Sequence, residues 1–138
     1  MKKRMIVILT VVWLVVLFRI TVFRAGCFSH GLLSGRVEWA AFAYYATLAR
    51  VGNWRYFLYL FVGNLVWFAP AGVLARLLGK GFWTGVLWGF LLSLLVEALQ
   101  YLLGSGVTEL DDLILNTAGA ALGYAAASLV TRRKTATM

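Results

Sequence analysis

The sequence predicts an all-α integral membrane protein: a four-helix bundle with an extracellular interfacial or re-entrant segment between its first and second helices. Of the 138 residues, 62% are hydrophobic and 13% are charged, and the mean hydropathy is +0.86. This composition lies far from that of soluble domains. Four apolar runs each approach the roughly 20 residues that cross a bilayer. Because these runs and their connections occupy nearly the whole chain, residues 1–138 are expected to form a single transmembrane domain.

The first two helices are predicted over residues 6–23 and 56–78. Arg19 interrupts the first helix near its end, where a long side chain can snorkel or face the bundle. This apolar run exceeds the usual length of a signal-peptide core and lacks a clear small-x-small cleavage site, so we expect an uncleaved helix. Pro70 lies within the second helix, and a membrane helix tolerates it because neighbours satisfy the freed carbonyl.

The last two helices are predicted over residues 82–103 and 112–130. Only residues 79–81 separate the second helix from the third, so these two must form a tight antiparallel hairpin. The fourth helix is rich in alanine and glycine, which allow close backbone approach between packed membrane helices. We therefore expect the fourth helix to be central.

The long connection over residues 25–55 carries the weakest pattern. Val37, Ala41, Tyr44 and Leu48 recur at helical spacing, and tryptophans and tyrosines favour the headgroup level. An interfacial or re-entrant helix fits this pattern. A fifth crossing is disfavoured because the uncharged stretch 39–49 is about half as long as a span.

Basic residues between the apolar runs predict the orientation. Eight lie at the termini and in the short connection between helices two and three: Lys2, Lys3, Arg4, Arg76, Lys80, Arg132, Arg133 and Lys134. Four lie in the long connection: Arg24, Arg36, Arg50 and Arg55. Because cytoplasmic connections carry the excess of lysine and arginine, both termini are expected in the cytoplasm.

Charge and cysteine usage exclude several other classes of protein. A net charge of +8 would suggest nucleic acid in a soluble protein, but these bases lie at the ends of apolar runs, so no nucleic-acid partner is expected. Cys27 is the only cysteine and His30 the only histidine, without a repeated ligand spacing. We predict neither a metal nor another cofactor, and the lipid bilayer as the surrounding partner.

Polar residues within the predicted helices gather in the outer half of the membrane. They are Arg19 in the first helix, Asn64 in the second, Glu97 and Gln100 in the third, and Asp111, Asp112 and Asn116 where the fourth begins. Residues three, four or seven apart share a helix face. Ser93 therefore joins the stripe of the third helix, and the last three helices each carry one polar stripe.

These stripes predict a polar pocket open to the extracellular side, walled by the last three helices and reached by Arg19. A carboxylate such as Glu97 costs several kcal/mol inside a bilayer unless it is protonated, paired or wet, so it marks a functional site. Arg19 is its expected partner. The expected ligand contacts are Arg19, Asn64, Ser93, Gln100, Asp111 and Asn116, and Glu97 and Asp112 are the candidates for chemistry.

An enzymatic interpretation stays open beside the binding one. Glu97 and Asp112 could act as general acid and base, or hold a divalent metal with Asn116 and Gln100 as neutral oxygen ligands. The protein would then be a membrane hydrolase or transferase acting on an envelope lipid. No HExxH, GxSxG or paired-cysteine motif supports this interpretation.

Structural interpretations of the polar residues also stay open. Asn64, Gln100 and Asn116 could join helices through hydrogen bonds worth about 0.6 to 2 kcal/mol each. Asp111 could cap the fourth helix. A transporter subunit is disfavoured because four short helices make a thin pathway unless the chain oligomerises, and the sequence does not give the oligomeric state.

The same residues form an ordered pattern. One helix carries an Asn, a Phe and a Pro-x-Gly, the next a Ser-x-x-x-Glu-x-x-Gln, and the last an Asp-Asp-x-x-x-Asn-x-x-Gly-x-x-x-Gly-Tyr. Here they are Asn64, Phe68, Pro70 and Gly72; Ser93, Glu97 and Gln100; and Asp111, Asp112, Asn116, Gly119, Gly123 and Tyr124. Over roughly residues 60–124 this pattern resembles the VanZ-like family, which is associated with glycopeptide resistance.

The chain departs from that pattern at one place. The family often has an arginine a few residues before the paired aspartates, whereas this chain has residues 106–109, Gly-Val-Thr-Glu. The role of that arginine would be absent here or would pass to Arg19, Arg36 or Arg55.

The resemblance implies a multi-pass protein of the bacterial plasma membrane. The family's named member lowers susceptibility to teicoplanin, a glycopeptide that carries a lipid. An outer-leaflet lipid or a lipoglycopeptide is therefore the expected ligand, and the resemblance leaves open whether the protein binds this ligand or acts on an envelope lipid.

Overall fold

The structure, a computed structural model, describes residues 3–24, 27 and 31–136, of which 132–136 by their backbone alone. In this part of the chain the elements are α1 (Lys3–Thr21), β1 (Arg36–Glu38), α2 (Ala43–Arg50), α3 (Trp54–Leu77), α4 (Phe82–Leu103), β2 (Val107–Glu109) and α5 (Leu110–Ala136). Helices α1, α3, α4 and α5 are long and apolar enough to cross a membrane. The predicted all-α membrane bundle is confirmed.

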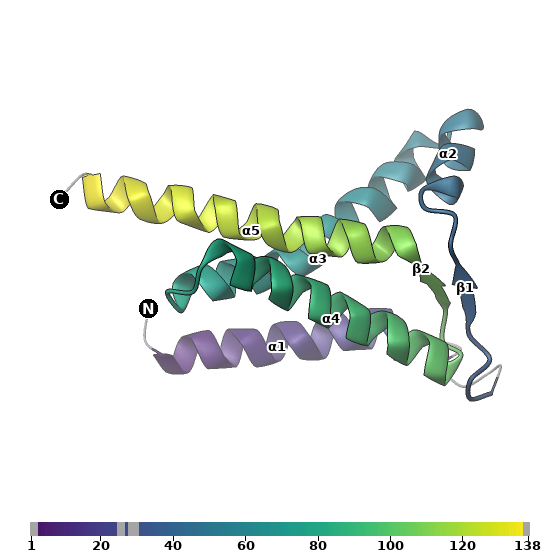
Figure 1. The fold of residues 1–138 in the computed structure, drawn as a ribbon, viewed down its shortest axis with the longest axis horizontal. Helices are drawn as coiled ribbons and strands as arrows, with labels where there is room; N and C mark the ends of the chain where they lie inside the picture. Colours follow the sequence, from purple (N-terminus) through teal and green to yellow (C-terminus); the bar gives the residue numbers. More distant parts are fainter. Residues whose placement is uncertain (1–2, 25–26, 28–30, 137–138) are drawn as a thin grey trace.

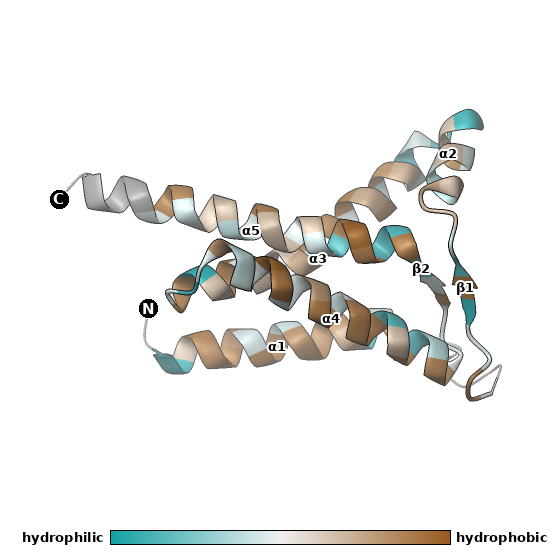
Figure 2. Ribbon diagram, in the orientation of Figure 1, coloured by the Kyte–Doolittle hydropathy of each residue, from teal (hydrophilic) through white to brown (hydrophobic). Residues whose placement is uncertain are grey.

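The long helices extend between two different ends of the molecule. The chain termini and the α3–α4 turn lie at one end, which we call the terminal end, and α2, β1 and β2 lie at the other, the loop end (Figure 1). Apolar residues dominate the helices, and hydrophilic residues are concentrated toward the two ends (Figure 2). Large side chains such as Val15, Trp83 and Leu87 are exposed along the helices, as expected of surfaces that face lipid.

The closest helix packing is between α3 and α5. A Cβ placed on Gly119 would meet the backbone of Leu65, and one on Gly123 would meet the backbone of Ala69. The glycines therefore let the two backbones touch, as small residues do in packed membrane helices. This arrangement gives α5 the central position that its composition predicts.

Helix α1 is attached to this pair more loosely. Leu17 is its buried residue and packs with Val22, Phe68 and Val96 in the apolar core. The indole nitrogen of Trp13 also donates a hydrogen bond of 2.9 Å to the carbonyl oxygen of Trp67 in α3. Most of the remaining surface of α1 is exposed.

The long connection differs from the predicted continuous helix. Val37 lies in β1, which pairs in parallel with β2, and the helix extends only over Ala43–Arg50. The amide nitrogens of Leu33 and Gly35 also donate hydrogen bonds to carbonyl oxygens in the last turn of α4. Backbone groups of this connection thus bond β2 and the end of α4 instead of forming a helix among themselves. Periodicity in the sequence does not reveal such distant partners.

The ends of the long helices follow local signals. The side chain of Asn53 accepts a hydrogen bond from the Tyr56 amide and begins α3, and Gly104, with a φ of 58°, ends α4. Helix α4 spans the expected residues. Helix α5 begins two residues before the expected start, so Asp111 and Asp112 lie in its first turn.

We predict opposite effects for two glycines of α3 and α5. Gly119→Ala should lower the free energy of unfolding by about 1 to 3 kcal/mol, because the added methyl group meets the Leu65 backbone. Gly63→Ala is the matched control: a Cβ there meets nothing within 4 Å, and losing a helical glycine adds up to about 1 kcal/mol of stability. Unfolding in mixed micelles, followed by circular dichroism, measures both. Equal stability of the two variants would contradict the packing described.

Candidate functional site

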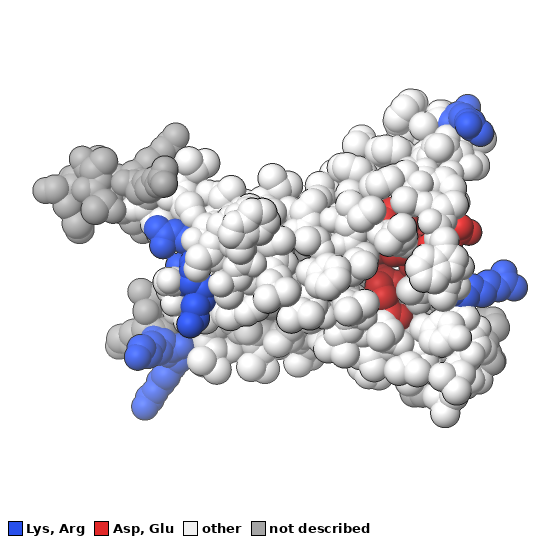
Figure 3. All heavy atoms as spheres, in the orientation of Figure 1, with Lys and Arg blue, Asp and Glu red and all other residues white. Residues whose placement is uncertain are grey.

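A cavity of about 350 Å³ lies at the loop end of the bundle; we call it the polar cavity. Residues from six elements, together with Arg24 just after α1, line it: Ile20, Arg24, Tyr44, Tyr45, Tyr56, Tyr59, Leu60, Gly63, Asn64, Trp67, Gln100, Val107, Glu109 and Asp112. Figure 3 shows the acidic side chains gathered on this half of the molecule. Three of the predicted site residues, Asn64, Gln100 and Asp112, line the cavity together.

Asn64 and Asp112 join α3 to α5 at the wall of the cavity. The side-chain amide of Asn64 donates a hydrogen bond to Oδ1 of Asp112. The α3 stripe that begins at Asn64 is buried: Gly72 lies against the α5 backbone at Ala120, and Phe68 packs in the core with Leu17, Val22 and Val96. The predicted shared face therefore brings the two polar residues together.

Ser93 and Asn116 form a second link, deeper in the bundle. The amide nitrogen of Asn116 donates to the hydroxyl oxygen of Ser93 at 2.9 Å, and both residues are fully buried. Neither residue lines the polar cavity. Their geometry matches the interhelical hydrogen bond that was an alternative to ligand contact for Asn116.

Glu97 faces β2 rather than the cavity. Its Oε2 accepts a hydrogen bond of 3.0 Å from the amide nitrogen of Glu109, and its backbone carbonyl accepts one of 3.1 Å from the Thr108 hydroxyl. The residue is buried. It is near enough to Asp112 for the two carboxyl groups to interact electrostatically. Glu97 thus fixes β2 against α4 and lies behind the cavity wall.

Gln100 connects α4 to the end of α1. Its Nε2 donates to the backbone oxygen of Thr21 at 3.3 Å. Because Nε2 points to this carbonyl, the amide orientation is set, and Oε1 has no hydrogen-bond partner among the described residues although it is buried. Gln100 therefore contributes an unused acceptor to the site.

Asp111 is buried and is not among the residues that line the cavity. Its carboxyl group lies near the backbone amides of Phe42 and Asp112. These contacts hold the residues before α2 against the first turn of α5. The arrangement agrees with the capping interpretation of Asp111.

The expected pairing of Arg19 with Glu97 is wrong. Arg19 is exposed, and its Nη1 donates to the backbone oxygen of Phe23 at 2.6 Å, because its place near the end of α1 favours snorkelling. Arg24 lines the cavity instead, and its Nε donates to the Ser105 carbonyl oxygen at 2.6 Å. Its guanidinium lies over Gly106, where a Cβ would meet it.

Glu109 was not among the predicted site residues. Carboxylate oxygens of Glu109, Asp111 and Asp112 all lie within 4.8 Å of one another. Burial, followed by the carboxylates of Asp112, Asp111 and Glu38, raises the pKa of Glu109 to about 7, against a lowering by Arg24. The run of three acids over residues 109–112 was the available signal, and the turn from β2 into α5 brings them together.

Four tyrosines complete the lining. Tyr44 and Tyr45 come from α2, and Tyr56 and Tyr59 from the first turns of α3. The rings of Tyr44 and Tyr56 meet edge to face at 6.5 Å. Burial, followed by the nearby acidic residues, raises the pKa of Tyr45. Sequence patterning assigned Tyr44 and Tyr45 to the headgroup level, and only the fold reveals that all four tyrosines line one space.

The polar residues of α3, α4 and α5 occur along the chain in the same order as in a known family. The sequence profile described as VanZ/LLP1 matches residues 5–131. The chain belongs to the VanZ/LLP1 family. The VanZ/LLP1 match includes α1 and the long connection, and so extends well beyond the residues of the initial resemblance. No curated protein and no solved structure matches the chain significantly.

Glu109 should make stability depend on pH. An ordinary glutamate has a pKa of 4.5, and Glu109 in the folded protein has one of about 7. Between these values the folded state holds more protons than the unfolded chain, so the free energy of unfolding falls as pH rises. Glu109→Gln should remove this contribution.

Unfolding midpoints of wild type and Glu109→Gln in mixed micelles, at about pH 5 and about pH 8, measure the effect. Wild type should lose stability relative to the variant at the higher pH. A difference between the two proteins that is constant with pH would contradict the prediction.

Proposed function

We propose that this VanZ/LLP1 membrane protein binds the polar head of a lipid-like or cell-envelope ligand in the polar cavity. The observation that carries the proposal is the lining: Asn64, Gln100, Glu109 and Asp112 surround a space of about 350 Å³ in an otherwise apolar bundle. Ionisable groups are costly at membrane depth and mark ligand pathways where they face a cavity. The set also differs from the buried Ser93–Asn116 pair, which does not line the cavity.

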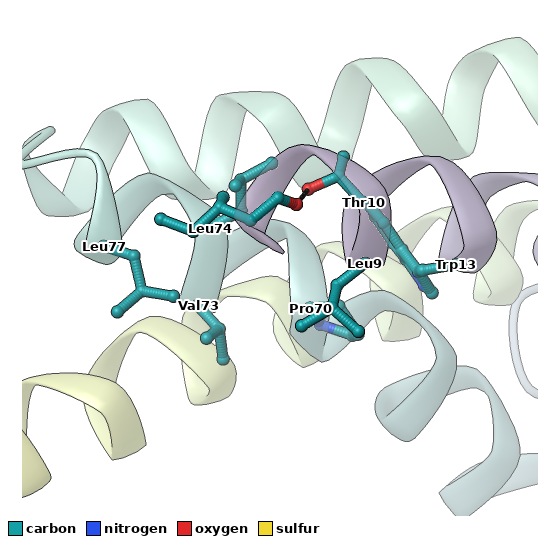
Figure 4. A pocket seen from close by; sticks show the side chains of 8 residues that line it. Leu9, Thr10, Trp13, Pro70, Val73, Leu74 and Leu77 are labelled. Carbon is teal, nitrogen blue, oxygen red and sulfur yellow. Dashed lines mark hydrogen bonds between the residues drawn. The ribbon is translucent and has the colours of Figure 1, made fainter. Parts of the chain in front are cut away.

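An apolar groove between α1 and α3 offers space for the chain of such a ligand. The groove encloses about 140 Å³ and is lined by Ile6, Leu9, Thr10, Trp13, Pro70, Val73, Leu74 and Leu77, whose side chains Figure 4 draws between the two helices. The Thr10 hydroxyl donates to the Ile6 carbonyl, so it does not make the groove polar. Trp13 of the groove bonds Trp67 of the polar cavity. The groove and the polar cavity therefore lie next to each other where Trp13 of α1 contacts Trp67 of α3.

The orientation of the cavity follows from the basic residues. Arg76 and Lys80 lie at the α3–α4 turn, at the terminal end, whereas the acidic residues lie toward the loop end (Figure 3). With the terminal end in the cytoplasm of a bacterial cell, the polar cavity faces outward. A ligand in the outer leaflet, or a lipoglycopeptide such as teicoplanin, would then reach it without crossing the membrane.

A hydrolase or transferase is the second candidate function. The electrostatic proximity of Glu97 and Asp112 favours it, since paired carboxyl groups can divide acid and base roles. However, the Glu97 carboxylate is held by the Glu109 amide and does not line the cavity. Binding is the function that the lining supports better.

Filling the cavity should abolish binding without disturbing the fold. Gly63 lines the cavity, and a Cβ there meets nothing within 4 Å, so Gly63→Leu projects into free space. Gly81→Leu is the matched control, because that glycine also has free space but lies at the terminal end. Native mass spectrometry of protein extracted in mild detergent counts the retained envelope lipid. Gly63→Leu should retain about tenfold less than wild type, and Gly81→Leu as much.

The same variants link the cavity to antibiotic susceptibility. Wild type and Gly81→Leu should lower the teicoplanin susceptibility of a susceptible Gram-positive host, and Gly63→Leu at the same membrane level should not. Lipid retention by Gly63→Leu equal to that of wild type would refute binding in this cavity. Protection by all three proteins would separate resistance from the cavity.

Labelling of single cysteines tests the orientation. In a Cys27→Ser background, Glu38→Cys at the loop end should react with a membrane-impermeant maleimide in intact cells, since Glu38 is exposed. Lys80→Cys, exposed at the terminal end, should react only after the cells are opened. The reverse pattern would mean that the cavity faces the cytoplasm.

A further inference from the structure

The charge of the polar cavity is unbalanced. Glu109 and Asp112 line it, with Asp111 close behind, whereas Arg24 is the single basic residue in the lining among those that the structure describes. Arg24 is already engaged with the Ser105 carbonyl oxygen and lies over Gly106. The cavity therefore carries more negative than positive charge, which favours a cationic ligand group and repels an anionic one.

The hydrogen-bonding atoms that remain free in the lining also favour a cationic group, because they are acceptors. Oε1 of Gln100 is an acceptor without a partner among the described residues, and Gln100 is only 7% exposed. The carboxylates of Glu109 and Asp112 are acceptors when ionised. A ligand group that satisfies these atoms must bring several N–H or O–H donors. A protonated primary amine brings three donors and no acceptor.

The tyrosines add a third argument for a cation. The rings of Tyr44, Tyr45, Tyr56 and Tyr59 line the same space as the acids. Aromatic faces attract ammonium groups through their quadrupole. The raised pKa of Tyr45, to which the acidic residues contribute after burial, is consistent with a negative potential here.

We infer that the ligand of the polar cavity is an amphiphile whose head carries a protonated amine with N–H donors. The inference rests on the proposed function and specifies its ligand class. The amine lies between the carboxylates of Glu109 and Asp112 and the tyrosine rings, donates to Oε1 of Gln100, and leaves the chain to the groove between α1 and α3.

Competition among three lipids tests this inference. The full-length protein is equilibrated in mixed micelles with equimolar phosphatidylethanolamine, phosphatidylcholine and phosphatidylglycerol of identical acyl chains, and native mass spectrometry counts each bound lipid. All three carry a phosphate; only the first has an amine with N–H donors. Wild type should retain phosphatidylethanolamine about fivefold over either competitor.

Asp112→Asn and Glu109→Gln should reduce this preference toward equal retention. Glu38→Gln is the matched control, because Glu38 is exposed and does not line the cavity, and it should keep the preference. The wild-type measurement needs no variant to fold. The preference should also persist in a chelator, since the donors come from the amine and not from a divalent cation.

The outcomes separate the two levels of the proposal. Retention of no lipid at all would refute the proposed function. Equal retention of the three lipids, or preference for phosphatidylglycerol or phosphatidylcholine, would overturn the amine inference and leave lipid binding standing. Loss of the preference in a chelator would assign the acids to a divalent cation and would equally overturn the inference.

Discussion

The close approach of α3 and α5 determines where every other polar residue can lie. Gly119 and Gly123 bring the α5 backbone into contact with that of α3 at Leu65 and Ala69. Asn64, the residue directly before Leu65 on α3, then faces the first turns of α5, where it meets Asp112. The glycines and the polar pair therefore act as one unit. Lipid provides no hydrophobic force between helices, so close packing and hydrogen bonds such as these must supply the association.

The polar residues form two sets that lie at different depths in the bundle and have different roles. Ser93 and Asn116 lie at the buried crossing of α4 and α5, and their hydrogen bond needs no ligand to explain it. Asn64 and Asp112 lie where the helices separate to admit α2 and β2, and there the same types of side chain border open space. The chemistry of a side chain alone could not assign it to one set, because its position relative to the loops decides the role.

Sequence reasoning was accurate where helical spacing governs the structure and failed where distant segments meet. Spacing placed Asn64, Phe68 and Gly72 on one face, and in the structure that face is buried, with Asn64 and Gly72 in contact with α5. No periodic signal relates residues 36–38 to 107–109, so the parallel pairing of β1 with β2 was out of reach. That pairing, together with Asp111 and Phe42, positions α2 and so brings tyrosines to the cavity. The part of the site that spacing missed is the part that tertiary contacts build.

Tertiary contacts also explain why Arg24 rather than Arg19 lines the cavity. The family pattern predicts an arginine close to the paired aspartates in sequence, a role that would be absent here or pass to Arg19, Arg36 or Arg55. The structure places the Arg24 guanidinium where a side chain at Gly106 would begin, next to the turn that leads into Glu109. A residue without a side chain at 106 is what makes room for Arg24, and any larger residue there would displace it. The positive charge at this wall thus comes from Arg24, which the fold brings close although it is distant in sequence from the paired aspartates. Among the described residues, the basic charge at the cavity is the one guanidinium of Arg24, which is bonded to the Ser105 carbonyl oxygen. The acidic residues of the cavity therefore remain in excess.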